Sequence, residues 1–180
     1  FVLAFCSRPL RIPSILFYDD FEFKTNFMFS EWFGNKLYVP NALPKGRKKR
    51  VRYPSFKELA YLHPSIYQPQ ESIIKKIGLA KNDYVFVREV AGISMNYTDL
   101  KDCGLLEAIK HLHQKNVKVV LSLEDKSKKK FYEPYCTILE EPLEDIYSIM
   151  AFAKFMLSSG DSMARESALL GVPCIYSGGR

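Results

Sequence analysis

The sequence predicts an α/β protein in which a parallel sheet is flanked by helices on both faces, accompanied by a partial second α/β domain. From residue 81 onward, five short apolar runs alternate with amphipathic or charged segments, the order expected of parallel strands joined by crossover helices. Apolar residues make up 47% of the chain and charged residues 26%, as in globular proteins. A chain of 180 residues can also bury a sizeable core without disulfides.

Residues 1–44 are expected to be the remnant of an amino-terminal α/β domain. Apolar runs at 1–5, 14–18 and 36–40 are typical of short buried strands, and the segment 19–34 is compatible with a helix. The aromatic residues between 21 and 33 favour packing in a core or at a domain interface over stacking on bases.

Residues 45–80 are expected to be a basic linker and connecting segment. Six basic residues lie between Lys45 and Arg52, with prolines on either side, which is typical of an exposed loop. A short helix is expected within 69–79, ending at Gly78. The basic residues that could touch an anionic surface weakly are Lys45, Arg47, Lys48, Lys49 and Arg50.

Residues 81–180 are expected to be the carboxyl-terminal nucleotide-binding domain, truncated at its end. The expected strands are 83–89, 117–123, 135–140, 154–160 and 172–179. The expected helices are 98–116 with Thr98 or Asp99 as N-cap, 142–153 with Pro142 near its start, and 161–171 closed by Gly171. A further charged loop or helix is expected at 125–134.

The turn at Gly160 is the most informative candidate site. In an open parallel sheet, ligands bind outside the carboxyl ends of the strands. A strand ends at this turn and a helix begins at once, so the amides of Gly160, Ser162 and Met163 are expected to point outward and bind an anion such as phosphate. Ala164, Ala168 and Leu169 are expected to pack closely on the sheet.

Two charged residues extend this candidate site. Glu166 lies four residues after Ser162 on the same helix face, where its carboxylate could accept hydrogen bonds from two sugar hydroxyls of a nucleotide. Arg88 ends the strand at 83–89 and could clamp a diphosphate. A surface carboxylate and a salt bridge at the rim, with Glu89 or another acid, are the alternative interpretations of the two residues.

The string GDSMARESALLGVPCIY resembles the helix-and-strand signature of the carboxyl-terminal domain of GT-B glycosyltransferases and of UDP-N-acetylglucosamine 2-epimerases. It resembles more closely a family of predicted archaeal and bacterial glycosyltransferases catalogued as a domain of unknown function. The segments FKELAYLHP and VFVRE are similar to the same family in the same order, and IPSILFYDDFE resembles the end of its first domain.

The resemblance implies a two-domain GT-B protein that binds a nucleotide sugar, with a UDP-sugar as the expected donor, in an interdomain cleft. On that model Ser162 and Met163 face the diphosphate, Glu166 faces the ribose and Arg88 lines the cleft. The implied activity is glycosyl transfer to an unknown acceptor, with the nucleotide sugar as substrate and no cofactor or metal. No residue is assigned as the catalytic base.

Two other functions remain open at this point. A UDP-N-acetylglucosamine 2-epimerase would use the same domain but needs acid–base groups near the sugar carbon; His63, at a domain junction, is the candidate, whereas His111 and His113 are expected at the surface of a helix. A non-catalytic module could instead bind nucleic acid or another acidic surface through the basic loop.

The remaining features concern compartment and extent. The four cysteines form no CxxC pair, so metal-ligand spacing is absent and buried free thiols are expected, Cys6 and Cys174 among them. No apolar run is long enough to span a membrane, and no signal peptide is visible. A cytoplasmic location is therefore expected. Both ends of the sequence suggest a fragment of a larger protein.

Overall fold

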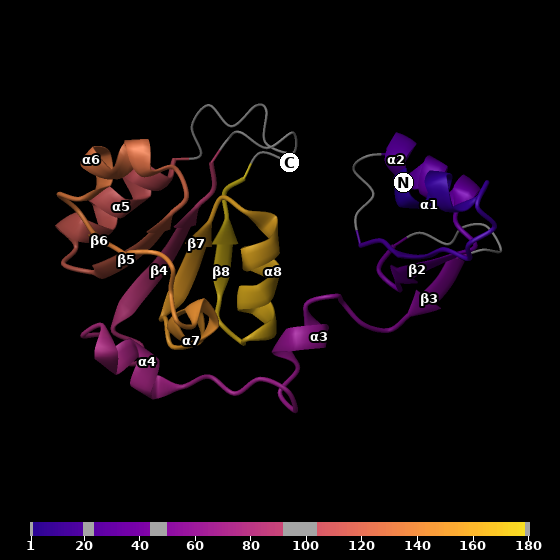
Figure 1. Cartoon of the computed structure of the whole chain (residues 1–180). Helices are drawn as coiled ribbons and strands as arrows, with labels where there is room; N and C mark the ends of the chain where they lie inside the picture. The colour runs from indigo at the N-terminus through magenta and orange to yellow at the C-terminus, as the bar shows by residue number, and fades with distance from the viewer. Residues whose placement is uncertain (1, 20–23, 44–49, 92–103, 179–180) are drawn as a thin grey trace. The chain divides into compact units, whose positions relative to one another are not determined.

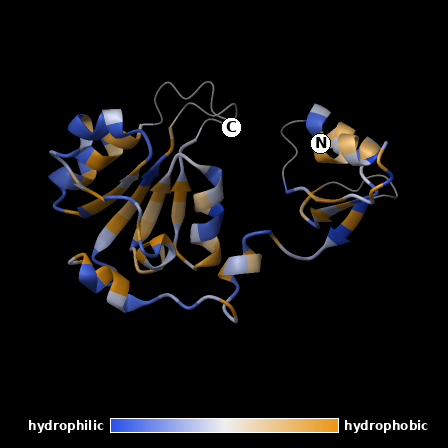
Figure 2. Cartoon of the chain, in the orientation of Figure 1, coloured by the Kyte–Doolittle hydropathy of each residue, from blue (hydrophilic) through white to orange (hydrophobic). Residues whose placement is uncertain are grey.

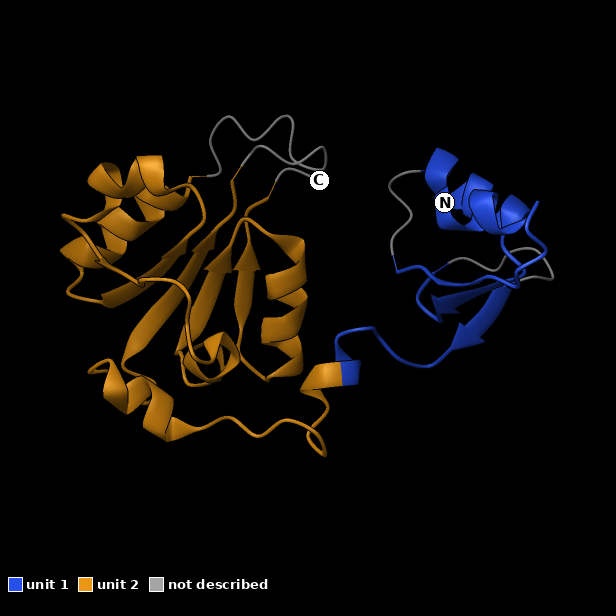
Figure 3. Ribbon diagram, viewed as in Figure 1, with its two compact units in different colours: residues 1–60 blue, residues 61–180 orange. Residues whose placement is uncertain are grey.

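The structure is a computed structural model that describes residues 2–19, 24–43, 50–91 and 104–178. Two compact units divide it, the first formed by Phe1–Ala60 and the second by Tyr61–Arg180 (Figure 3). Each unit contains its own parallel sheet. The expected α/β architecture, with parallel sheets flanked by helices, is confirmed.

The first unit has a three-stranded sheet in the order β1-β2-β3. All its strand pairs are parallel, and Phe27, Leu37 and Val39 form the small buried core beneath it. The elements are α1 (Val2–Ser7), β1 (Ile15–Phe17), α2 (Lys24–Phe33), β2 (Lys36–Pro40) and β3 (Arg50–Tyr53) (Figure 1).

The first apolar run of the chain is a helix, not the expected buried strand. Helix α1 buries only Ala4 and Ser7, and the ring of Phe5 packs edge-on against Phe33 of α2 with centroids 5.1 Å apart. A short apolar run does not by itself distinguish strand from helix, and here contact with α2 decides. Cys6 lies on this helix and is exposed, so the expectation of a buried thiol is also wrong.

The end of the basic segment belongs to a sheet and not to a linker. Residues Arg50–Tyr53 form β3, which pairs in parallel with β2 from Leu37 to Pro40. The first compact unit therefore extends to Ala60, beyond the boundary expected at residue 44. Residues 45–49 lie outside the described ranges.

A connecting segment leads into the second sheet. It contains the four-residue helix α3 (Leu59–Leu62), which spans the division between the units, and α4 (Glu71–Lys76). The chain leaves α4 through Gly78, whose φ of 70° favours glycine, so the expected short helix ending there is confirmed.

The second unit has a five-stranded sheet in the order β6-β5-β4-β7-β8, and all neighbouring strands are parallel. Its strands are β4 (Tyr84–Glu89), β5 (Lys118–Leu123), β6 (Thr137–Ile138), β7 (Phe155–Ser158) and β8 (Cys174–Tyr176). All five lie within the ranges expected from the sequence. Its other elements are α5 (Leu105–Gln114), the 3₁₀ turn η1 (Lys126–Lys128), α6 (Lys129–Tyr132), α7 (Ile146–Ala151) and α8 (Asp161–Leu169).

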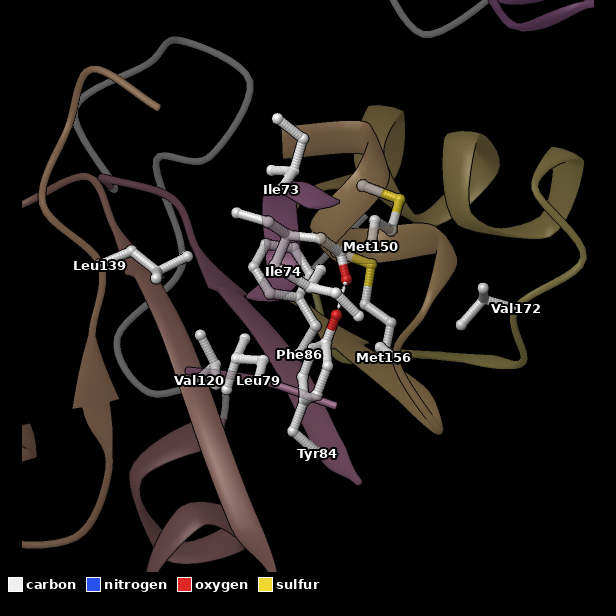
Figure 4. Packing of buried hydrophobic residues seen from close by; sticks show 12 residues of the cluster. Ile73, Ile74, Leu79, Tyr84, Phe86, Val120, Leu139, Met150, Met156 and Val172 are labelled. Carbon is white, nitrogen blue, oxygen red and sulfur yellow. Dashed lines mark hydrogen bonds between the residues drawn. The ribbon is translucent and has the colours of Figure 1, made fainter. Parts of the chain in front are cut away.

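Both faces of this sheet are covered, as the continuous apolar runs predict. Tyr84 and Phe86 of β4 point to the face that packs against α4, α7 and α8, while Val85 and Val87 point to the face covered by α5 and α6. Figure 4 shows residues of the first cluster, in which the Tyr84 hydroxyl donates a hydrogen bond to the carbonyl of Ile149. The strands carry hydrophobic colours along much of their length in Figure 2.

Two helices of this unit begin later than expected. Helix α5 begins at Leu105 after Gly104, which adopts a φ of 67°; the expected caps Thr98 and Asp99 lie outside the described residues. Helix α7 begins at Ile146, and its N-cap is Asp145 instead of the region near Pro142. Helix α8 is closed by Gly171 at a φ of 77°, as expected.

Within the described residues, no helix is both long and apolar enough to cross a membrane.

Candidate functional site

The strand order creates a topological switch point at the carboxyl edge of the second sheet. From β4 the chain first adds β5 and β6 on one side of the sheet and then returns to add β7 and β8 on the other side. The crevice between the ends of β4 and β7 is therefore the expected ligand position. Ser159 joins these two ends. Its amide donates to the carbonyl of Arg88 at 3.0 Å, and its Oγ accepts from the amide of Val90 at 2.9 Å.

Helix α8 begins at this switch point. Its N-cap is Gly160, in an extended conformation and without a side-chain capping bond, so no side chain of the N-cap occupies the first-turn amides. Ser162 is exposed and Met163 is half-buried. Gly160 itself is buried, and its amide donates to Ser158 Oγ at 3.1 Å. The expectation that this amide points outward is therefore wrong.

The side chain of Arg88 is held by acidic partners at the same edge. Its Nη1 donates to Ser122 Oγ at 2.7 Å and to Glu141 Oε1 at 3.3 Å, and its Nη2 donates to Glu124 Oε1 at 3.2 Å. Ser122 Oγ in turn donates to Glu141 Oε1 at 3.0 Å. Of the two interpretations of Arg88, the structure shows a salt bridge at the rim, with Glu124 and Glu141 as partners in place of Glu89.

A cavity of about 480 Å³ brings Arg88 and Met163 together. Its other lining residues are Glu141, Pro142, Leu143 and Ile146. The walls are thus mainly apolar, with a guanidinium and a carboxylate as polar groups. A cavity of this composition at the carboxyl edge of a parallel sheet is the expected form of a small-molecule site.

Glu166 lies on the inner side of α8 and is buried, with 6% of its surface exposed. Its Oε1 accepts two tyrosine hydroxyls, from Tyr61 at 2.7 Å and from Tyr147 at 3.1 Å. Glu166 is therefore not the surface carboxylate of the alternative interpretation. Its role toward a ligand stays a prediction.

The two tyrosines remain hydrogen-bond donors at neutral pH. Burial raises the pKa of both hydroxyls above the ordinary 10.0, and the hydrogen bond to Glu166 and its negative charge raise it further. Removal of either proton would leave a phenolate beside a carboxylate. The arrangement therefore stabilises the protonated tyrosines.

The residues that α8 buries are not the small apolar ones, since Ala164 and Leu169 are only half-buried. The helix buries Glu166 and Ser167, whereas Ala168 is exposed. Ala164 and Ala168 instead line an outer cavity of about 630 Å³ together with residues of the turn and strand that follow. The expected close packing is wrong for Ala168, because α8 presents Glu166 and Ser167 inward.

Several polar residues of this region were not singled out from the sequence. Asp145 caps α7 by accepting from the amides of Tyr147 and Ser148 at 3.0 and 3.2 Å, and it also accepts the hydroxyl of Tyr67 at 2.8 Å. An aspartate directly before an apolar helical run is a recognisable capping signal. The contacts of Tyr61 and Tyr67, by contrast, leave no local signal, because their partners lie 105 and 78 residues away.

The three histidines are exposed, and the described end of the basic segment is bound within the first unit. His63 is exposed and its Nδ1 contacts Ser65 Oγ at 2.6 Å, while His111 and His113 are exposed on α5, as expected. Arg50 binds Glu31 through two hydrogen bonds of 2.7 and 3.1 Å and lies over the ring of Phe27. Its guanidinium is thus occupied inside the first unit, which contradicts a free contact with an anionic surface.

Three solved structures with a similar fold are UDP-GlcNAc 2-epimerases. One from Methanocaldococcus jannaschii aligns with a TM-score of 0.65 at 15% identity, covering 96% of this chain and 56% of its own. The enzyme from the same organism in complex with UDP-GlcNAc and UDP gives 0.69 at 14% identity, with coverage of 96% and 55%. One from Rickettsia bellii gives 0.65 at 16% identity, with coverage of 95% and 51%.

These similarities define the class: an α/β protein with a GT-B-like fold. The chain belongs to the family described as "Protein of unknown function (DUF354)", whose model matches residues 42–178. It is also 28% identical over 111 residues to the uncharacterized protein MJ0665 of Methanocaldococcus jannaschii, covering 61% of this chain and 32% of that protein. The chain thus spans about half the length of the solved structures and a third of this relative.

Proposed function

We propose that the second unit binds a nucleotide sugar, with UDP as the nucleotide, and that the whole protein is a glycosyltransferase. The observation that carries the proposal is the cavity of about 480 Å³ that joins Arg88 to the first turn of α8 at the carboxyl edge of the sheet. The similarity of fold to epimerases, one of them solved with UDP-GlcNAc and UDP, supports the choice of ligand.

The cavity and the helix start offer complementary chemistry. Pro142, Leu143 and Ile146 provide apolar walls for a planar base. The first-turn amides of α8, together with the helix dipole, favour the negative charge of a diphosphate. In a transfer reaction, the same amides would stabilise the charge that develops on the leaving diphosphate. Ser162, exposed beside them, would add a hydroxyl donor.

Glu166 completes the proposed site as the acceptor of ribose hydroxyls. It lies three residues after Met163, which lines the cavity, and residues three apart are neighbours on one helix face. A carboxylate can accept both hydroxyls of a vicinal diol. Arg88 would act by holding Glu141 at the rim of the cavity, since both its terminal nitrogens already have acidic partners.

Calorimetric titration with UDP tests this assignment. We expect Glu166→Ala to weaken UDP binding at least tenfold, because a charged hydrogen bond contributes roughly 1.5–3 kcal/mol. Glu107→Ala is the matched control, since Glu107 is exposed on α5 and pairs only with Lys110 among the described contacts. Glu166→Gln separates loss of charge from loss of volume. Equal UDP affinity of the wild type and Glu166→Ala would reject the site.

Epimerisation is the second candidate, because the similar solved structures are UDP-GlcNAc 2-epimerases. Glycosyl transfer needs an acceptor, whereas epimerisation does not. Incubation of the full-length protein with UDP-GlcNAc and no acceptor therefore separates the two reactions. Formation of the epimer favours the epimerase, and turnover that depends on an added acceptor favours the transferase.

A further inference from the structure

A chain of tyrosine hydrogen bonds attaches the segment 61–70 to the candidate site. Tyr61 donates to Glu166 on α8, and its ring lies 5.7 Å from that of Tyr147. Six residues later, Tyr67 donates to Asp145 at the start of α7. The amide of Gln70 then donates to Ser148 Oγ at 2.7 Å. The segment that connects the units is therefore attached to both helices of the site.

The two tyrosines on Glu166 differ in how firmly they are held. Tyr147 is half-buried on α7, whose start is fixed by the Asp145 cap. Tyr61 is 39% exposed and lies on the four-residue helix α3. An exposed side chain on so short a helix loses little buried surface when it moves. Tyr61 is thus the partner that can leave Glu166 most readily.

A ligand diol and Tyr61 need the same acceptor. Both tyrosine bonds end on Oε1 and occupy both lone pairs of that oxygen, so a diol that binds both oxygens of this buried carboxylate needs one of the two donors to withdraw. A diol supplies two hydroxyl donors where Tyr61 supplies one. The exchange keeps the buried carboxylate hydrogen-bonded, which its burial requires.

We propose that a vicinal diol of the ligand displaces the Tyr61 hydroxyl from Glu166, so that ligand binding and attachment of residues 61–67 to the site oppose each other. This inference rests on the proposed nucleotide-sugar function. Tyr61 is then a residue that lowers affinity and couples the connecting segment to occupancy of the site. By thermodynamic linkage, loosening the segment raises the affinity for the ligand, and the ligand loosens the segment by the same factor.

The variant Tyr61→Phe isolates the hydroxyl, because it keeps the ring beside Tyr147. We expect it to bind UDP at least about tenfold more tightly than the wild type, the value of one hydrogen bond to a charged group. Tyr135→Phe is the matched control, since Tyr135 lies outside this segment and packs on the other face of the sheet, beside His113. It should leave UDP affinity within about twofold. With 2′-deoxy-UDP, which lacks the diol, the gain from Tyr61→Phe should disappear.

Hydrogen exchange on the wild type gives a second measurement that requires no variant. We expect UDP to accelerate exchange of the amides in residues 61–67. Unchanged or weaker UDP binding by a folded Tyr61→Phe protein, or slower exchange in this segment with UDP, would overturn the competition while leaving the nucleotide site intact. Failure of the wild type to bind UDP at all would instead refute the proposed function, and the competition with it.

Discussion

Replacement of Asp145 by alanine should destabilise the second unit more than any other single polar truncation near α7. The carboxylate accepts the amides of Tyr147 and Ser148 as the helix cap and also the hydroxyl of Tyr67 at 2.8 Å. Loss of an N-cap costs about 1 kcal/mol. Loss of a hydrogen bond to a charged group costs about 1.5–3 kcal/mol. We therefore expect a loss of roughly 3 kcal/mol in the free energy of unfolding.

The two units allow this loss to be assigned. The single tryptophan, Trp32, lies in the first unit, so its fluorescence reports unfolding there. Urea unfolding followed by circular dichroism reports both units. Unfolding of the second unit is seen by circular dichroism but not by Trp32 fluorescence. Asp145→Ala should lower the urea midpoint of that transition and leave the urea midpoint of the fluorescence transition unchanged.

Two variants complete the test. Asp125→Ala removes a carboxylate that also caps a helical turn, accepting the Ser127 amide at 3.0 Å, but the site is exposed, so the expected cost is about 0.5–1 kcal/mol. Tyr67→Phe should cost about 1.5 kcal/mol alone and little more in the Asp145→Ala protein, because the shared bond is already lost. Equal losses for Asp145→Ala and Asp125→Ala, or full additivity with Tyr67→Phe, would refute the reasoning.

Two further predictions concern pH and a buried ion pair. Burial is the largest cause that raises the pKa of four tyrosines above the ordinary 10.0, namely Tyr61, Tyr67, Tyr84 and Tyr147. The folded state therefore holds these protons more tightly than the unfolded state. The resulting contribution to folding stability is fully present below about pH 10 and is lost as pH rises through the raised pKa values. Urea midpoints of the second unit should fall above that pH and stay level if the reasoning is wrong. Arg50→Ala should leave Glu31, which is 7% exposed, without its ion-pair partner and lower the free energy of unfolding of the first unit by about 3 kcal/mol, followed by Trp32 fluorescence. Lys75→Ala, in the exposed pair with Glu71, should lower the free energy of unfolding by less than about 1 kcal/mol. A similarly small loss for both variants would contradict this prediction.

The sequence predicts the second sheet well because its strands are buried on both faces. Continuous apolar runs such as 83–89 and 117–123 alternate with helices along the chain, and they are stable only as buried strands of a parallel sheet. The first unit is harder to predict, since its elements are short and share one small core of Phe27, Leu37 and Val39. There, contact between α1 and α2 decides that residues 2–7 form a helix.

The candidate site is predictable in position but not in detail. The Gly160 turn follows from local sequence, and the structure places it at the switch point. The partners of Arg88 and Glu166 do not follow from local sequence, because hydrogen bonds between residues 19 to 105 positions apart depend on how the strands and helices assemble. Asp145 is the exception, since capping is a local property.

The pair Arg88 and Glu89 fixes the alignment of β4 with its neighbours. With apolar side chains on both faces, a slip of this strand by one residue would still bury apolar groups, so hydrophobicity alone specifies the pairing weakly. The slip would carry Arg88 to the face where Lys128 now binds Glu89 at 2.5 Å, and Glu89 to the face of Glu141. Like charges would then meet on both sides of the sheet. Two adjacent residues of opposite charge thus specify the register of the central strand of the five-stranded sheet.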